Sequence, residues 1–80
     1  MTEKTTKTIG QRMAQALENR AKENGITSKQ ECEKLNIPYD TFRDWHKRSV
    51  CPSTYYLRKL ALAGYDVYWI LTGERKKNAV

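Results

Sequence analysis

Hydrophobic residues recur every three or four positions from residue 9 to residue 21, as they do on the buried face of an α-helix. This stripe consists of Ile9, Met13, Ala16, Leu17 and Ala21. Thr8 and Gln11 have the spacing of a capping box, which satisfies free N–H groups at the start of a helix. Gly25 favours the left-handed conformation in which helices often end. The pattern therefore predicts a first helix that begins at Thr8 and ends at Gly25.

A second, shorter helix is predicted directly afterwards, because Thr27 and Gln30 form another capping box ahead of "SKQECEKL". Its inward positions are expected to be Cys32 and Leu35, with Ile26 and Ile37 flanking its ends. Asn36 tolerates positive φ better than most residues, so it predicts a tight turn after this helix.

The stretch "NIPYDTFRDWHKRS", residues 36–49, has the spacing of a third helix. We expect it to start at Pro38 and to end near Ser49, because Pro52 follows. Phe42 and Trp45 are expected to face the core, with Pro38 on the same side. Steps of about 100° per residue then place a mixed-charge row on the opposite side, formed by Asp40, Arg43, Asp44 and Lys47.

Two more helices complete the pattern. Ser53 is expected to cap a fourth helix that ends at Gly64, and Asp66 to cap a fifth that ends at Gly73. The inward positions of the fourth helix are expected to be Leu57, Leu60 and Ala61. "VYWIL" would also suit a strand, but a lone strand has nothing to pair with. The sequence thus predicts an all-α domain of five helices over residues 8–73, between a flexible segment 1–7 and a basic flexible tail 74–80.

Composition and charge narrow the function. Eighty residues make one small domain with one modest core. Fifteen Lys and Arg against nine Asp and Glu give a net charge of +6, which favours a polyanionic partner such as nucleic acid. A polar start and the lack of a long apolar run predict a cytoplasmic protein with reduced Cys32 and Cys51, without membrane association. No zinc-type ligand spacing, nucleophile–base pair or phosphate-binding glycine loop is visible, so we expect no metal, cofactor, small-molecule ligand or enzymatic activity.

Two segments resemble a known family. "GITSKQECEKLNIPYDTFRDW" (25–45) resembles the helix-turn-helix of the phage repressor and Cro family, and "LRKLALAGYDVYWILTGER" (57–75) is similar to the end of the DNA-binding domain of phage repressors. The chain departs from the family where Asn36 replaces a turn glycine, Pro38 a Ser or Thr cap, and Ser28 a phosphate-binding glutamine. The resemblance implies a lambda-repressor-like domain in a bacterial host cell that binds a palindromic DNA operator as a homodimer, with residues 38–48 in the major groove.

The outward side of the third helix is then the candidate base-reading surface. Arginine donates two bonds to guanine, carboxylates accept from cytosine, and Tyr or Thr contacts a thymine methyl group or a phosphate. The candidates are Tyr39, Asp40, Thr41, Arg43 and Asp44. Phosphates repel carboxylates that find no donor, so the acids would penalise wrong sequences. The alternative is a solvated face with two ordinary ion pairs, Asp40–Arg43 and Asp44–Lys47, worth about 0.2–0.5 kcal/mol each.

Two further sets of residues follow from the same arrangement. Candidate phosphate contacts lie around the third helix, namely Ser28, Lys29, Lys47, Arg48, Ser49, Ser53 and Thr54. The aromatic residues near the C-terminus are too many for a small core, which predicts an exposed partner surface. Candidates for the dimer interface are Tyr65, Val67, Tyr68 and Ile70; the alternative is that Trp69, Ile70 and Leu71 close the core against the first helix.

The sequence therefore favours a sequence-specific transcriptional regulator that binds double-stranded DNA, a repressor of phage or prophage type. The alternative is a protein-binding adaptor or antirepressor that uses the same fold without sequence-specific DNA binding. The mixed charges on the third helix would suit such an interface.

Overall fold

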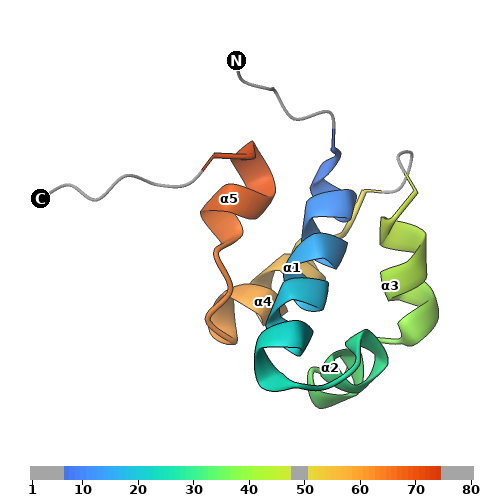
Figure 1. The fold of residues 1–80 in the computed structure, drawn as a ribbon. Helices are drawn as coiled ribbons and strands as arrows, with labels where there is room; N and C mark the ends of the chain where they lie inside the picture. The colour runs from blue at the N-terminus through green and yellow to red at the C-terminus, as the bar shows by residue number, and fades with distance from the viewer. Residues whose placement is uncertain (1–6, 48–50, 75–80) are drawn as a thin grey trace, which may run out of the picture.

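The computed structural model describes residues 7–47 and 51–74, and this part of the chain forms five α-helices and no strands. The helices are α1 (Ile9–Asn24), α2 (Ser28–Lys34), α3 (Tyr39–Trp45), α4 (Thr54–Leu62) and α5 (Val67–Thr72). In Figure 1, α1 runs through the middle of the molecule, with α3 and α5 on opposite sides of it. α1 packs against α2, α3 and α5, while α4 packs against α5. The predicted all-α class is confirmed; residues 1–6 and 75–80 of the two predicted flexible segments lie outside the described residues.

Both predicted capping boxes are present. Thr8 Oγ1 accepts a hydrogen bond from the Gln11 backbone N–H, while Gln11 Oε1 accepts from the Thr8 N–H. Thr27 and Gln30 make the same reciprocal pair at the start of α2. Gly25 ends α1 with a φ of 70°, the left-handed conformation that glycine adopts without steric cost.

The core draws side chains from all five helices. The largest fully buried ones are Trp45, Met13, Leu17, Leu60, Ile70 and Cys32. Burying such a side chain completely stabilises the folded state by about 1.5–3 kcal/mol. Two predicted inward positions are wrong, because Ala61 and Pro38 are exposed. Leu57 in α4 and Ala63 directly after the helix pack against the core on the same side as Leu60, which turns Ala61 outward.

α3 is shorter than predicted and begins differently. Pro38 precedes the helix with an extended ψ of 135°, and the helix ends at Trp45 rather than near Ser49. The backbone N–H groups of His46 and Lys47 donate to carbonyls three residues back, which tightens the last turn and closes the helix. At α4, Ser53 is the N-cap residue as predicted, but its side chain makes no capping hydrogen bond.

The sequence did not indicate the buried guanidinium of Arg12. Arg12 Nε donates to the Ile70 carbonyl at 2.7 Å, and its Nη1 and Nη2 donate to the carbonyls of Lys7 and Leu71. Ile70 and Leu71 lie in the last turn of α5, where carbonyls have no partner within the helix. Arg12 thus caps α5 with a positive charge at its negative end and fixes it on α1.

Candidate nucleic-acid interface

α2 and α3 are joined by a tight turn over residues 35–38. Asn36 has a φ of 59° and is the only residue other than glycine with a positive φ in the described part of the chain. Its backbone reversal lets the Ile37 N–H donate to the Cys32 carbonyl at 2.9 Å, and it turns the Ile37 side chain into the core. The predicted turn at Asn36 is confirmed, and it sets the direction of α3 relative to α2.

One side of α3 is anchored in the core and the other faces solvent. Phe42 and Trp45 are buried, as the spacing predicts. The exposed side carries the charged row of Asp40, Arg43, Asp44 and Lys47. Of the two flanking candidates, Tyr39 is exposed and stacks on the Phe42 ring with 5.4 Å between ring centroids, while Thr41 is half-buried. All five candidate base-contacting residues therefore lie on α3, with Thr41 nearest the core.

The two ion pairs expected on a solvated helix face are present. Arg43 Nη1 lies 3.5 Å from Asp40 Oδ1, and Lys47 Nζ lies 3.5 Å from Asp44 Oδ1. All four side chains are more than half exposed. Exposed pairs of this kind contribute little to stability. The four side chains can therefore break these ion pairs and form contacts with other partners at small energetic cost.

The candidate phosphate contacts are spread over three segments. Lys29 is exposed and Ser28 half-buried in the first turn of α2, while Ser53 and Thr54 are exposed where α4 begins. Backbone N–H groups without helical partners gather at such helix starts. Lys47 is exposed and already paired with Asp44. The candidates Arg48 and Ser49 lie outside the described residues.

The sequence did not indicate a buried carboxylate on the inner side of α2, which holds this helix in place. Glu31 is only 2% exposed, and its Oε2 accepts a hydrogen bond from the Tyr65 hydroxyl at 2.5 Å. Its Oε1 has Lys34 Nζ at 3.7 Å but no hydrogen bond. Burial raises the pKa of Tyr65 well above its ordinary value, and the hydrogen bond to Glu31 and its charge raise it further. Glu31 shares the inward stripe of Cys32 and Leu35, so helical periodicity was the signal available for it.

The proposed dimer patch needs correction at two positions. Ile70 has no exposed surface and Tyr65 is 8% exposed, because α5 and the turn before it pack into the core. Tyr68 is 46% exposed and Val67 half-buried, so these two remain surface candidates. The alternative prediction is that Trp69, Ile70 and Leu71 close the core against the first helix. Ile70 is fully buried and Trp69 is partly buried against the core, as this alternative predicts, whereas Leu71 is exposed.

Two negative observations and one comparison complete the description. None of the helices in residues 7–47 and 51–74 combines the length and hydrophobicity needed to cross a bilayer. Within the same residues, no three or more His, Cys, Asp or Glu side chains gather as metal ligands would. Comparisons with protein-family models, with curated proteins and with solved structures found no match to this chain.

Proposed function

We propose that this protein is a sequence-specific regulator of transcription, a repressor of phage or prophage type, which binds double-stranded DNA with α3 in the major groove. The observation that carries the proposal is the outward side of α3, where a continuous charged row lies opposite the buried Phe42 and Trp45. α3 follows α2 through a tight turn at Asn36. Two short helices in this order are typical of a lambda-repressor-like helix-turn-helix, whose second helix reads base edges.

The charges on α3 suggest how sequences are discriminated. The net charge of +6 attracts the chain to DNA of any sequence. In the groove, Arg43 would leave Asp40 and donate to a guanine, while Asp44 would accept from a cytosine. A wrong base leaves a carboxylate without a donor near the phosphates, and each good contact of this kind discriminates by about 1–3 kcal/mol. Attraction and selectivity therefore come from different residues.

The starts of α2 and α4 would hold the backbone. Exposed Lys29 and the hydroxyls of Ser53 and Thr54 suit phosphate oxygens. Each ion contact adds about 0.9 to the slope of log affinity against log salt concentration. A homodimer on a palindromic operator would place two α3 helices about 34 Å apart, one turn of DNA. Tyr68 and Val67 are the dimer candidates that retain exposed surface.

Selection of sites from random duplex DNA by the purified protein tests the proposal. We expect an enriched inverted repeat, bound with an affinity that falls steeply as salt increases. No enrichment over bulk DNA contradicts base reading. A protein-binding adaptor, which the mixed charges of α3 would also suit, would give a shallow salt slope and no preferred site.

A charge-matched pair of variants locates the contact. Arg43→Ala and Arg58→Ala each remove one exposed positive charge, from α3 and α4 respectively. We expect Arg43→Ala to weaken binding to the selected site by about 10-fold or more, the equivalent of one lost bidentate contact. Arg58→Ala should have a much smaller effect. Equal losses in the two variants would mean that only net charge matters.

A further inference from the structure

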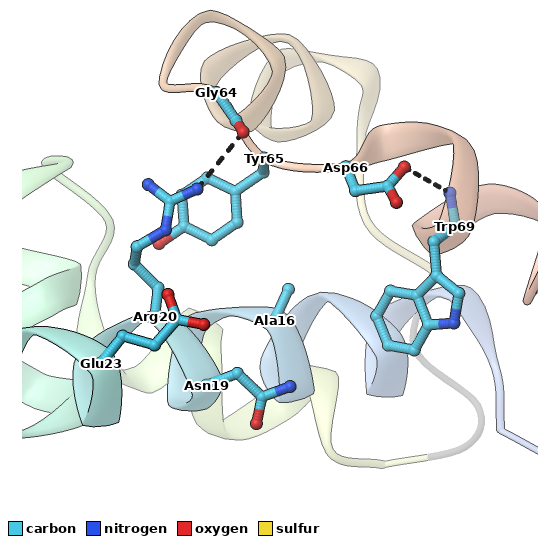
Figure 2. A pocket seen from close by; sticks show the side chains of 8 residues that line it. All are labelled: Ala16, Asn19, Arg20, Glu23, Gly64, Tyr65, Asp66 and Trp69. Atoms are coloured by element: carbon cyan, nitrogen blue, oxygen red, sulfur yellow. Dashed lines mark hydrogen bonds between the residues drawn. The ribbon is translucent and has the colours of Figure 1, made fainter. Parts of the chain in front are cut away.

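Polar side chains of α1 reach neighbouring segments on opposite sides of the helix. On one side, Arg20 Nη1 and Nη2 donate to the carbonyls of Ala63 and Gly64 at 3.4 and 3.3 Å. These contacts lie at one end of a cavity of about 210 Å³ that Trp69 lines at its other end (Figure 2). Arg20 thereby holds the turn that joins α4 to α5 against α1.

On the other side of α1, two residues contact His46, which directly follows α3. Gln11 Nε2 donates to the His46 carbonyl at 2.8 Å, and His46 Nε2 lies 3.3 Å from Glu18 Oε2. Gln11 and Glu18 are about two helical turns apart, so they share one face of α1. The ion pair requires a protonated imidazole and is partly exposed, so it adds little by itself. The uncharged amide of Gln11 is therefore the more constant link.

The link joins two helix ends that need partners. The start of α1 and the end of α3 lie at the same end of the molecule (Figure 1). His46 is the C-cap residue of α3, and carbonyls at this position have no partner within their helix. Gln11 supplies a donor there from the positive end of α1. The His46 ring also packs edge-on against buried Phe42, with 5.1 Å between ring centroids.

The side-chain amide of Gln11 makes two bonds at once. Its Oε1 accepts from the Thr8 N–H at 3.1 Å in the capping box of α1, while its Nε2 donates to His46. The amide cannot be reversed, because Nε2 would then face the Thr8 N–H, and Oε1 would face the His46 carbonyl. One planar group thus ties the first turn of α1 to the end of α3 in a fixed orientation.

We propose that Gln11 is a positioning residue for DNA reading, which holds the end of α3 on α1 and thereby sets where Asp44 and Lys47 meet the groove. α3 has only seven residues, and both charged side chains lie within two positions of His46. A shift of this helix end would displace both, and hydrogen bonds weaken steeply when their geometry is lost. The inference rests on the function proposed for α3, whereas the bond from Gln11 to His46 is present in the free chain.

Two matched substitutions isolate the donor. Glutamate serves at the third position of a capping box as well as glutamine does, so Gln11→Glu keeps the cap of α1 and loses the N–H that His46 accepts. Gln30→Glu makes the same change in the capping box of α2, where Oε1 accepts from the Thr27 N–H at 2.9 Å. Within the described residues, Gln30 bonds to no other helix. Each variant adds one negative charge, so the difference between them reports the lost donor.

Amide hydrogen exchange of the free protein, followed by nuclear magnetic resonance, tests the link itself. The backbone N–H groups of His46 and Lys47 donate to carbonyls three residues back in the last turn of α3. We expect both to exchange about fivefold faster in Gln11→Glu, as the loss of one hydrogen bond implies. Gln30→Glu should leave both rates unchanged. Equal rates in the two variants would overturn the proposal.

Binding to the operator recovered from random duplex DNA, and to DNA without this site, tests the effect on reading at constant salt. We expect Gln11→Glu to weaken operator binding about tenfold more than Gln30→Glu does, as the loss of one base contact would. Both variants should bind non-specific DNA equally, because both carry the same charge. An equal ratio of specific to non-specific affinity in the two variants would overturn the positioning role. Failure to recover any operator would instead refute the proposed function, and the exchange rates would still decide whether Gln11 holds α3.

Discussion

The Tyr65→Phe substitution removes one hydroxyl from the core and deprives the buried Glu31 of its hydrogen-bond donor. Glu31 is 2% exposed, so water cannot replace the lost donor without opening the core. Hydrogen bonds to charged groups contribute about 1.5–3 kcal/mol, so we expect the free energy of unfolding to fall by about 2 kcal/mol. In a domain of this size the melting temperature would then fall by about 8–16 °C.

Urea denaturation followed by tryptophan fluorescence measures this loss, since Trp45 is buried and should report unfolding. Tyr55→Phe is the matched control, because Tyr55 is 62% exposed and makes no contact with Glu31. Its effect should stay below about 0.5 kcal/mol. A Tyr65→Phe variant as stable as Tyr55→Phe would refute the inference that the hydroxyl stabilises the buried carboxylate.

A double-mutant cycle with Glu31→Gln separates the charge from the hydrogen bond. Glutamine keeps an acceptor oxygen without the charge, so Tyr65→Phe should cost only about 1 kcal/mol in that background. The pKa of Tyr65 adds a dependence on pH. Its folded pKa is raised, so the stabilisation is complete below the unfolded pKa of about 10 and is lost as pH rises above it. The stability gap between wild type and Tyr65→Phe should therefore narrow above about pH 10.

Four further predictions concern other parts of the fold. Cys51 is exposed and Cys32 is buried, so mass spectrometry should find one thiol alkylated in the folded chain and two in urea. Burial raises the pKa of Cys32 from 9.0 to about 11, with smaller contributions from Glu31 and Glu33. The free energy of unfolding, measured by urea titration at each pH, should therefore fall as the pH rises above about 9. This fall should be smaller in the Cys32→Ala variant. Asn36→Ala should lower the free energy of unfolding by about 1 kcal/mol, because alanine is strained at positive φ, whereas Asn36→Gly should not. Arg12→Met should lower the free energy of unfolding, measured by thermal melts, by about 2–3 kcal/mol, because it leaves the carbonyls at the end of α5 without hydrogen-bond donors.

The parts of the fold that depend on local interactions could be predicted from the sequence. The capping boxes at Thr8 and Thr27 depend on residues three positions apart, and both are present. Asn36 adopts the positive φ that its side chain tolerates. Phe42 and Trp45 face inward because the apolar residues of α3 are three positions apart, which leaves one side of the helix for the core. These features need no knowledge of which helices meet.

Features that depend on contacts between distant segments could not be predicted. Arg12 and Glu31 both lie on the inward side of their helices, although charged side chains are usually exposed. Their burial is favourable because α5 supplies hydrogen-bond partners for Arg12 and Tyr65 supplies one for Glu31. The sequence predicts a dimer surface at Tyr65 and Ile70, whereas the packing of α5 and of the turn before it buries both side chains. The cavity beside Trp69 is built from α1 and a turn more than forty residues later, and no local pattern indicates it.

The most direct test of base reading by α3 is the affinity of Asp44→Ala for the selected operator and for every single base-pair variant of it, at constant salt. Glu74→Ala, which removes an exposed acid beyond α5, is the charge-matched control. We expect Asp44→Ala to lose discrimination at one base pair of each half-site, by about 1–3 kcal/mol, while non-specific binding stays the same or strengthens. Uniformly weaker binding at all sites, or a profile identical to that of Glu74→Ala, would contradict base reading by α3.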